Sequence, residues 1–128
     1  MSLRSPVGRV LGLGAAKKGV GHWWSQRVTS VALGFLTLWF VASLLTFESF
    51  ERTAVLAWIA APLNTVLLSL LILTTAYHSQ LGVQVVVEDY VEHKGSKVVT
   101  LLLLDFLHVA LAALGLYAVL RIGFGAVA

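Results

Sequence analysis

The sequence predicts an all-α membrane protein with three transmembrane helices. Of its 128 residues, 59% are hydrophobic and 12% are charged, whereas about 25% of the residues of a soluble domain are charged. The mean hydropathy is +0.91, and a soluble fold of this size could not bury so much apolar surface. The apolar residues form long runs, and a membrane-spanning helix needs about 20 of them. The chain has no cysteine, so it can hold neither a disulfide nor a thiolate-bound iron–sulfur cluster.

Residues 1–27 are predicted to form a basic segment on the cytoplasmic membrane surface. The basic residues are Arg4, Arg9, Lys17, Lys18 and Arg27. Glycines at positions 8, 12, 14, 19 and 21 disfavour a helix here. The segment has no long apolar core, so we expect no cleavable signal peptide. A mitochondrial transit peptide is the competing interpretation, but the segment has few serines and no clear amphipathic stripe.

The first predicted span covers residues 28–47, which carry no charge. After a short polar break, the apolar region 54–87 is too long for one ordinary span. Pro62 divides this region, because a helix accepts proline in its first turn and not in its interior. We therefore expect residues 54–61 to lie at the membrane interface, with Trp58 as an aromatic anchor.

The second predicted span covers residues 63–90, and the third covers residues 98–120. A charged loop over residues 88–97 ends the second span. Together the three spans make one transmembrane domain over residues 28–128. No internal repeat is present, and three spans cannot form an inverted pair of repeats by themselves.

The distribution of lysine and arginine predicts a cytoplasmic N-terminus and a periplasmic C-terminus. In this orientation the inner segments carry seven basic residues, and the outer segments carry only Arg52 and Arg121; basic residues concentrate in cytoplasmic loops. The first two spans then run antiparallel, which brings residues 25–27 and the pair Asp89 and Tyr90 to the same inner face. No basic stripe alternates with aromatic residues, so we expect no nucleic-acid partner.

His78 is the most informative candidate site residue. Counted back from Tyr90 at 1.5 Å per residue, it lies roughly 18 Å deep, near the middle of the bilayer. A histidine at this depth serves a metal, a proton path or a hydrogen bond to a neighbouring helix, and haem iron is the metal we expect. The second axial ligand would come from a partner chain or from His108. Gly82 lies on the same helix face, where a missing side chain lets a flat macrocycle approach.

Tyr90, Asp89 and Arg27 are predicted to form a second polar group at the inner face. A phenol donor, a carboxylate and a guanidinium together suit a small polar head group such as a quinone, whose reduction needs protons. The alternatives are an interfacial tyrosine, a solvated acid and a positive-inside arginine. Arg27 would also suit a haem propionate, and Ser25 and His22 are weaker members of the same pocket.

Asp105 and His108 share a face of the third span at i, i+3 spacing. Charged groups inside a span are functional candidates by default. They could pair with each other, contact a partner helix or help to hold a cofactor, and the sequence does not choose between these roles. Gln84 is expected to form a hydrogen bond between helices.

These residues resemble the hydrophobic membrane anchor subunit of succinate dehydrogenase, respiratory complex II, in its alphaproteobacterial form. The resemblance is carried by His78-x3-Gly82-x-Gln84-x4-Asp89-Tyr90-Val91, by Ser25-Gln26-Arg27-Val28-Thr29-Ser30 and by His22-Trp23-Trp24. It covers nearly the whole chain. It implies three spans that pack with a cytochrome b-type anchor subunit, a flavoprotein subunit with FAD and an iron–sulfur subunit with the clusters.

The resemblance also implies roles for single residues. His78 would be an axial ligand of a haem b shared with the partner anchor subunit. Tyr90 would donate a hydrogen bond to ubiquinone, Asp89 would support that site, and Arg27 would lie near the haem propionates or the quinone. The complex would pass electrons from succinate to quinone, and this chain alone would hold no complete active site. No role for Asp105 or His108 follows from the resemblance.

Two alternatives to this function remain open. One is a non-redox three-span protein, such as a pore former or an assembly factor, whose intramembrane polar residues serve as a proton path or hold helices together. The other is an anchor of a fumarate reductase, because the chain does not set the direction of the reaction. The expected location is the bacterial inner membrane, with the mitochondrial inner membrane as the competing location.

Overall fold

The computed structural model of the chain describes residues 19–125 and shows four helices within them. They are α2 (Gly19–Leu45), α3 (Arg52–Ala60), α4 (Pro62–Tyr90) and α5 (Lys94–Gly123). No strand occurs among these residues, which confirms the prediction of an all-α fold. The expectations for residues 1–18 and 126–128 lie outside the described residues.

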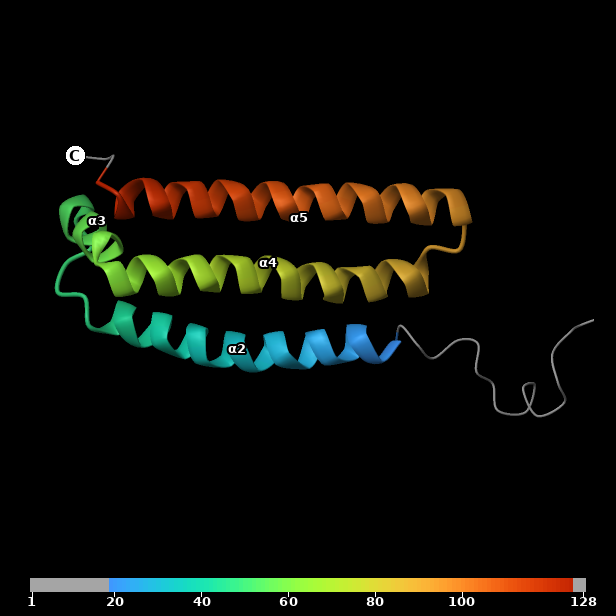
Figure 1. Cartoon of the computed structure of the whole chain (residues 1–128), viewed down its shortest axis with the longest axis horizontal. Helices are drawn as coiled ribbons and strands as arrows, with labels where there is room; N and C mark the ends of the chain where they lie inside the picture. Colours follow the sequence, from blue (N-terminus) through green and yellow to red (C-terminus); the bar gives the residue numbers. More distant parts are fainter. Residues whose placement is uncertain (1–18, 126–128) are drawn as a thin grey trace, which may run out of the picture.

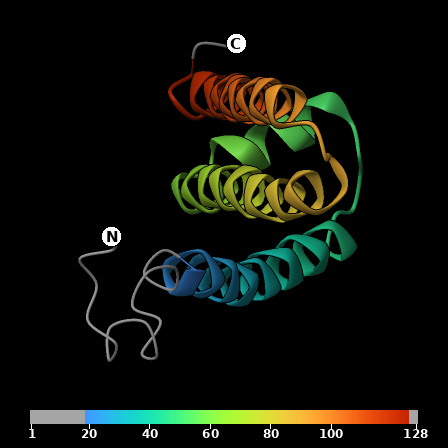
Figure 2. The same cartoon turned by 90° about the vertical axis from the view of Figure 1, so that its right-hand side faces the viewer.

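The three long helices run antiparallel and form a single layer with α4 in the middle (Figures 1 and 2). α4 packs against α2, α3 and α5, whereas α2 and α5 share no contact. The start of α2, the end of α4 and the start of α5 lie at one end of the molecule, and α3 lies at the other (Figure 1). This arrangement places residues 25–27 and the end of α4 together, as the antiparallel prediction requires.

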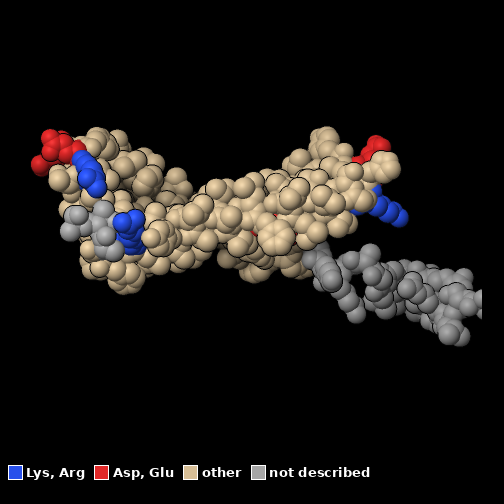
Figure 3. Space-filling view, turned by 90° about the horizontal axis from the view of Figure 1, so that it is seen from above, with Lys and Arg blue, Asp and Glu red and all other residues tan. Residues whose placement is uncertain are grey.

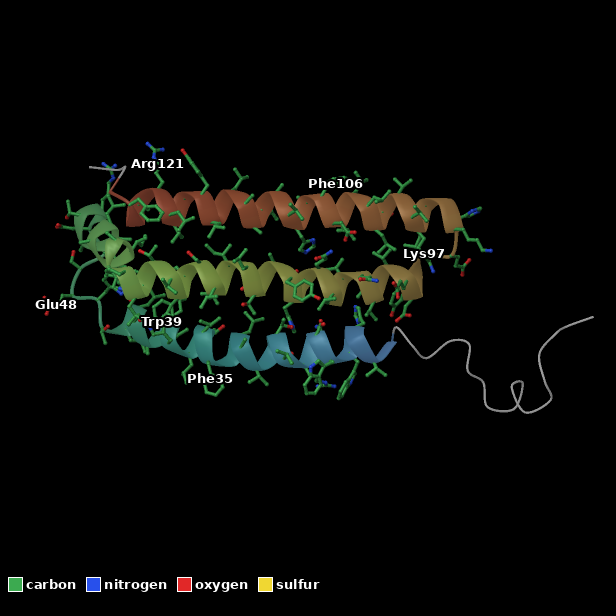
Figure 4. The ribbon with its side chains drawn as sticks, viewed as in Figure 1. Phe35, Trp39, Glu48, Lys97, Phe106 and Arg121 are labelled. Carbon is green, nitrogen blue, oxygen red and sulfur yellow. The ribbon has the colours of Figure 1, made fainter. Side chains whose placement is uncertain are left out.

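The outer surface of this layer is apolar along most of its length. On the face drawn in Figure 3, charged side chains gather at the two ends, and the long middle shows almost none. Phe35 and Phe106 are 73% and 71% exposed, and both lie on the sides of their helices that face away from α4 (Figure 4). By length and composition, α2 from Val20, α4 and α5 can each cross a membrane. The three predicted spans are thereby confirmed as helices of the required kind.

Two helix boundaries differ from the prediction. α2 begins at Gly19, so residues 19–27 are helical where we expected a poor helix former. Near a membrane every unpaired backbone N–H is costly, and this cost outweighs a glycine penalty of about 1 kcal/mol per residue. α5 begins at Lys94, so the predicted charged loop shrinks to residues 91–93.

Pro62 divides the long apolar region as predicted. It occupies the first turn of α4, where its missing N–H removes no helical hydrogen bond. The preceding residue, Ala61, is extended at φ −61° and ψ 127°, as a residue before proline prefers. Residues 52–60 form the separate helix α3, whose ring of Trp58 stacks on Trp39 of α2 at a centroid distance of 5.8 Å.

Aromatic side chains close this end of the molecule. Trp58 also meets the edge of Phe47 at 5.4 Å, and Phe47 lies 5.4 Å from Phe50. Trp39 lies near the end of α2, and Glu48 follows in the connection to α3 (Figure 4). These aromatic contacts connect α3 to the end of α2. The interfacial anchor role of Trp58 stays a prediction.

Candidate functional site

A cavity of about 850 Å³ lies between the first turns of α2 and the last three turns of α4. Its volume falls within the range of about 300–1,000 Å³ that ligand and cofactor pockets occupy. The residues that line it are His22, Trp23, Gln26, Arg27, Ser30, His78, Gly82, Gln84, Val85 and Glu88. The cavity thus brings together four of the residues that the sequence suggests for a haem site, namely His78, Gly82, Arg27 and His22.

The hydrogen bonds of Thr29 fix the tautomer of His78. The Thr29 hydroxyl lies 2.7 Å from the carbonyl oxygen of Ser25 and 2.9 Å from Nδ1 of His78. A carbonyl oxygen can only accept, so the single hydroxyl proton is donated to Ser25. Nδ1 of His78 must then carry a proton and donate it to Thr29. The other ring nitrogen, Nε2, is left with its lone pair.

Gln26 lies against this lone pair. Its amide nitrogen is 3.3 Å from Nε2 of His78 and donates to it. Gln26 Oε1 and His22 Nε2 are both buried without a hydrogen-bond partner in the described part of the chain. Buried polar atoms are almost always paired, so two such atoms in one cavity indicate a place for a polar ligand.

These residues fit a haem that approaches His78. A metal-bound histidine normally donates its other ring N–H to a fixed acceptor, and Thr29 is that acceptor. A side chain at Gly82 would begin 3.7 Å from the Gln26 amide nitrogen, so the glycine is not forced by tight helix packing and instead leaves the cavity open. Iron would replace the Gln26 amide at Nε2.

His108, the residue of this chain that the sequence suggests as a second ligand, lies away from the cavity in the described residues. It belongs to α5, its Nε2 lies 3.2 Å from the Ser79 hydroxyl, and it does not line the cavity. Among residues 20–125, no three His, Cys, Asp or Glu side chains gather as a metal site.

Arg27, His22 and Ser25 take different positions around the cavity. The guanidinium of Arg27 lies 5.6 Å from the ring centroid of Trp23, in a cation–π contact, and both residues line the cavity. His22 also lines it. Ser25 does not, and it contributes through its backbone carbonyl, which accepts from Thr29.

Asp89 and Tyr90 lie at the end of α4, outside the cavity lining. Both are exposed, and the Tyr90 side chain is 82% exposed. No hydrogen bond joins either residue to Arg27 within residues 20–125. Within the described residues these three side chains are not joined by hydrogen bonds, and the compact group of phenol, carboxylate and guanidinium stays a prediction.

Glu88 lines the cavity, whereas its neighbours Asp89 and Tyr90, which the sequence suggests for a polar pocket, do not. The Glu88 carboxylate accepts from the Gln84 amide at 2.7 Å, so within the described residues Gln84 bonds inside α4, and a bond from Gln84 to another helix stays a prediction. The backbone carbonyl of Glu88 accepts from Nζ of Lys97 at 2.7 Å, which joins the end of α4 to the start of α5 (Figure 4).

Asp105 and His108 each bond to α4. The Gln80 amide donates to Oδ1 of Asp105 at 2.8 Å, and His108 Nε2 meets the Ser79 hydroxyl. No hydrogen bond links Asp105 to His108 within the described residues. These contacts support a role for Asp105 and His108 in holding α5 against α4.

Sequence reasoning missed the polar stripe on α2. His22, Gln26, Thr29 and Ser30 follow the i, i+4, i+7, i+8 spacing of one helix face. The spacing can be read from the sequence, but only if residues 22–30 are taken as one helix. Because we expected residues 1–27 to be a poor helix, the stripe was not recognised.

The described helices include three that can cross a membrane, and the first two of these bring His22, Gln26 and His78 to one cavity. Residues 1–115 match the succinate dehydrogenase/fumarate reductase transmembrane subunit family. The chain belongs to this family, which confirms the resemblance seen in the sequence. No solved structure shows a significant match.

Individual relatives carry the name succinate dehydrogenase hydrophobic membrane anchor subunit. The protein of Rickettsia bellii is 32% identical over 88 residues, which are 69% of this chain and 70% of the relative. That of Rickettsia felis is 32% identical over 100 residues, 77% of this chain and 83% of the relative. That of Paracoccus denitrificans is 28% identical over 116 residues, 91% of this chain and 89% of the relative.

Proposed function

We propose that this chain is the hydrophobic membrane anchor subunit of a bacterial succinate:ubiquinone oxidoreductase. It lies in the inner membrane with its N-terminus in the cytoplasm and packs with a cytochrome b-type anchor subunit. The flavoprotein and iron–sulfur subunits, which hold FAD and the clusters, dock on its cytoplasmic side. The family match, the names of the relatives and the three apolar helices support this proposal.

The observation that carries the haem part of the proposal is the state of His78. Thr29 holds the Nδ1 proton, and Nε2 presents a lone pair to a cavity that contains two unpaired buried polar atoms. Neutral imidazole is the form that ligates iron. We therefore assign His78 as one axial ligand of a haem b shared with the partner anchor subunit. When bound, the haem supplies a one-electron redox centre in the membrane.

The polar residues at the mouth of the cavity suit the haem propionates or the edge of the quinone pocket. The guanidinium of Arg27 matches the geometry of a carboxylate. Within the described residues His22 Nε2 has no hydrogen-bond partner, so it is available to form a hydrogen bond to a propionate oxygen. Ser25 acts indirectly, because its backbone carbonyl accepts from Thr29 and so orients the hydroxyl that contacts His78.

Tyr90 and Asp89 are proposed to meet ubiquinone where this chain contacts its partners. The Tyr90 side chain is 82% exposed at the inner end of α4, so its phenol is free to donate to a quinone carbonyl. Asp89 lies beside it and is also exposed. A carboxylate next to the phenol can take up and release the protons that quinone reduction needs.

The haem assignment is tested by reduced-minus-oxidised absorption spectra of the purified four-subunit complex. We expect a b-type spectrum in the wild type and its loss or strong change in His78→Leu. His93→Leu is the matched control, because His93 is an exposed residue at the start of α5. An unchanged spectrum in His78→Leu would remove the ligand assignment.

The quinone assignment is tested with Tyr90→Phe. We expect quinone reduction by succinate to fall roughly tenfold, which corresponds to one lost hydrogen bond of about 1.4 kcal/mol. Succinate oxidation by an artificial acceptor should stay the same, since that acceptor bypasses the membrane site. Tyr117→Phe is the control, because Tyr117 is an exposed tyrosine of α5 and its substitution removes the same hydroxyl group elsewhere. Equal loss with both acceptors would contradict a quinone role.

Co-purification separates this function from its alternatives. Flavin and iron in stoichiometric amounts support the redox anchor, whereas a colourless homo-oligomer would support a pore former or an assembly factor. The family description covers fumarate reductase as well, and the relatives' name favours the succinate dehydrogenase. The relative rates of succinate oxidation and fumarate reduction by the whole complex decide between these two.

A further inference from the structure

The segment of α4 that carries His78 is held from two opposite sides. His78 bonds to Thr29 on α2, whereas the next two residues, Ser79 and Gln80, bond to α5. α2 and α5 lie on opposite sides of α4 (Figures 1 and 2). Because consecutive helical residues point about 100° apart, three neighbouring side chains can reach two different helices.

The bonds to α5 lie deep in the span. Asp105 stands 11 residues after Lys94, roughly 16 Å along the helix at 1.5 Å per residue. His108 Nδ1 donates to the Leu104 carbonyl at 2.8 Å, so its Nε2 accepts from the Ser79 hydroxyl. Gln80 donates to Asp105. Each pair therefore has a defined donor and acceptor.

The close contacts that glycines of α5 make with α4 lie away from His78. The close approaches are Gly115 against Ile72 and Gly123 against Thr65. Both lie about two turns or more from Ser79, toward the opposite end of the molecule. At the level of His78, the polar pairs are the contacts with directional geometry, and rotation of α4 would break them.

We propose that Asp105 and His108 are positioning residues that hold the rotation of α4, and with it the direction of the His78 ring toward the cavity. They act through Gln80 and Ser79 and touch no cofactor. This inference rests on the proposed haem function, because it concerns the ring that would ligate iron. It also gives a role to two intramembrane polar residues that the haem and quinone sites leave unused.

The test uses the whole purified complex and compares Ser79→Ala with Ser69→Ala. Both substitutions remove one serine hydroxyl from α4, but Ser69 donates only to the carbonyl of Thr65 in its own helix. The EPR g-values of a low-spin haem depend on the orientation of its axial imidazoles. We expect Ser79→Ala and His108→Leu to shift these values and the haem midpoint potential, and Ser69→Ala to leave both unchanged.

Conservative variants and a double variant make the test specific. His108→Gln and Asp105→Asn keep an acceptor, so they should stay close to the wild type, whereas Asp105→Leu should shift the spectrum. The double variant Ser79→Ala/His108→Leu should shift it no further than either single change, because both remove the same bond. If His108→Leu fails to assemble, Ser79→Ala decides the question.

Three outcomes would overturn the proposal. Ser79→Ala and His108→Leu could leave the EPR signal and the potential unchanged even though thermal stability falls, which would show packing alone. Ser69→Ala could produce the same shift as Ser79→Ala. A wild-type complex without haem would remove the proposed function itself, and that result is distinguished by the absence of any haem signal before a residue is changed.

Discussion

At the scale of single residues, the candidate site depends on which nitrogen of one imidazole carries a proton. A carbonyl of α2 accepts from Thr29, and this one fact makes Thr29 an acceptor toward His78. The free lone pair then faces Gln26 and the cavity. The backbone carbonyl of Ser25 on α2 thus determines which ring nitrogen of His78, on α4, carries the proton.

We predict that Thr29→Val weakens haem binding about 10–100-fold, the usual cost of losing an outer-sphere partner of a metal-bound histidine. Valine keeps the shape of threonine but leaves the Nδ1 proton without an acceptor. The measurement is the rate of haem transfer from the purified complex to a haem-scavenging protein. Thr37→Val, an exposed change on the same helix, should match the wild type. Equal transfer rates for all three proteins would contradict the assigned tautomer.

The sequence predicts part of this site and misses part of it for identifiable reasons. The depth of His78 and the antiparallel spans bring it near Arg27 and His22, and the structure places all three on one cavity. The position of Tyr90 follows a different rule, since side-chain direction at a helix end changes by about 100° with each residue. Spacing along the chain therefore places Tyr90 at the correct end without placing it in the cavity.

At the scale of elements, the sequence predicts the boundaries of α4 better than the start of α2. Pro62 marks the start of α4, and the acidic residues near Tyr90 mark its end, so both boundaries have a local signal. The start of α2 has none, because the helix runs through Gly19 and Gly21. There the environment of the membrane surface outweighs the local propensity of glycine. The sequence predicts the membrane surface for this segment but gives no signal for the residue at which the helix begins.

Close packing between α4 and α5 gives a prediction at this scale. A Cβ at Gly123 would lie 2.5 Å from Cγ2 of Thr65, whose hydroxyl donates to the Ile59 carbonyl at 2.6 Å. Thr65 is buried and held by this bond, so it cannot move away cheaply. We expect Gly123→Ala to lower the free energy of unfolding by about 1–3 kcal/mol, the usual cost of overpacking.

Thermal unfolding of the complex in detergent measures this effect, and two other glycines calibrate it. Gly115→Ala should cost less, because its Cβ would lie 3.1 Å from Cγ2 of Ile72, a contact that a shift of a few tenths of an ångström relieves. Gly34→Ala meets nothing within 4 Å and should be neutral or stabilising, since alanine favours a helix by about 1 kcal/mol over glycine. A midpoint for Gly123→Ala at or above that of Gly34→Ala would contradict the close approach.

At the scale of the whole molecule, the chain is a layer and has almost no core of its own. Four apolar residues are buried among those that the structure describes, namely Leu68, Leu81, Val87 and Val119. The two outer helices do not touch, so both faces of the layer stay open to lipid and to partner chains. Lipid can cover such apolar faces as well as a partner chain can, so the proposed second anchor subunit has an exposed surface on which to pack.

The orientation of this layer in the membrane yields the last prediction. Ser49 follows α2 at one end of the molecule, and Ser96 lies in the first turn of α5 at the other end. Both are exposed, and the chain has no cysteine. A single cysteine at either position is therefore the only thiol in the subunit. The positive-inside rule places Ser49 in the periplasm and Ser96 in the cytoplasm.

A maleimide that does not cross the inner membrane should label Ser49→Cys in intact cells and leave Ser96→Cys unlabelled. Inverted membrane vesicles should not label Ser49→Cys, and denatured protein should be labelled at both positions, which controls for shielding of Ser96 by docked subunits. The reverse pattern in intact cells would place the cavity of α2 and α4 on the periplasmic side. There it could not face an iron–sulfur subunit in the cytoplasm, so one labelling experiment tests both the topology and the proposed path of electrons.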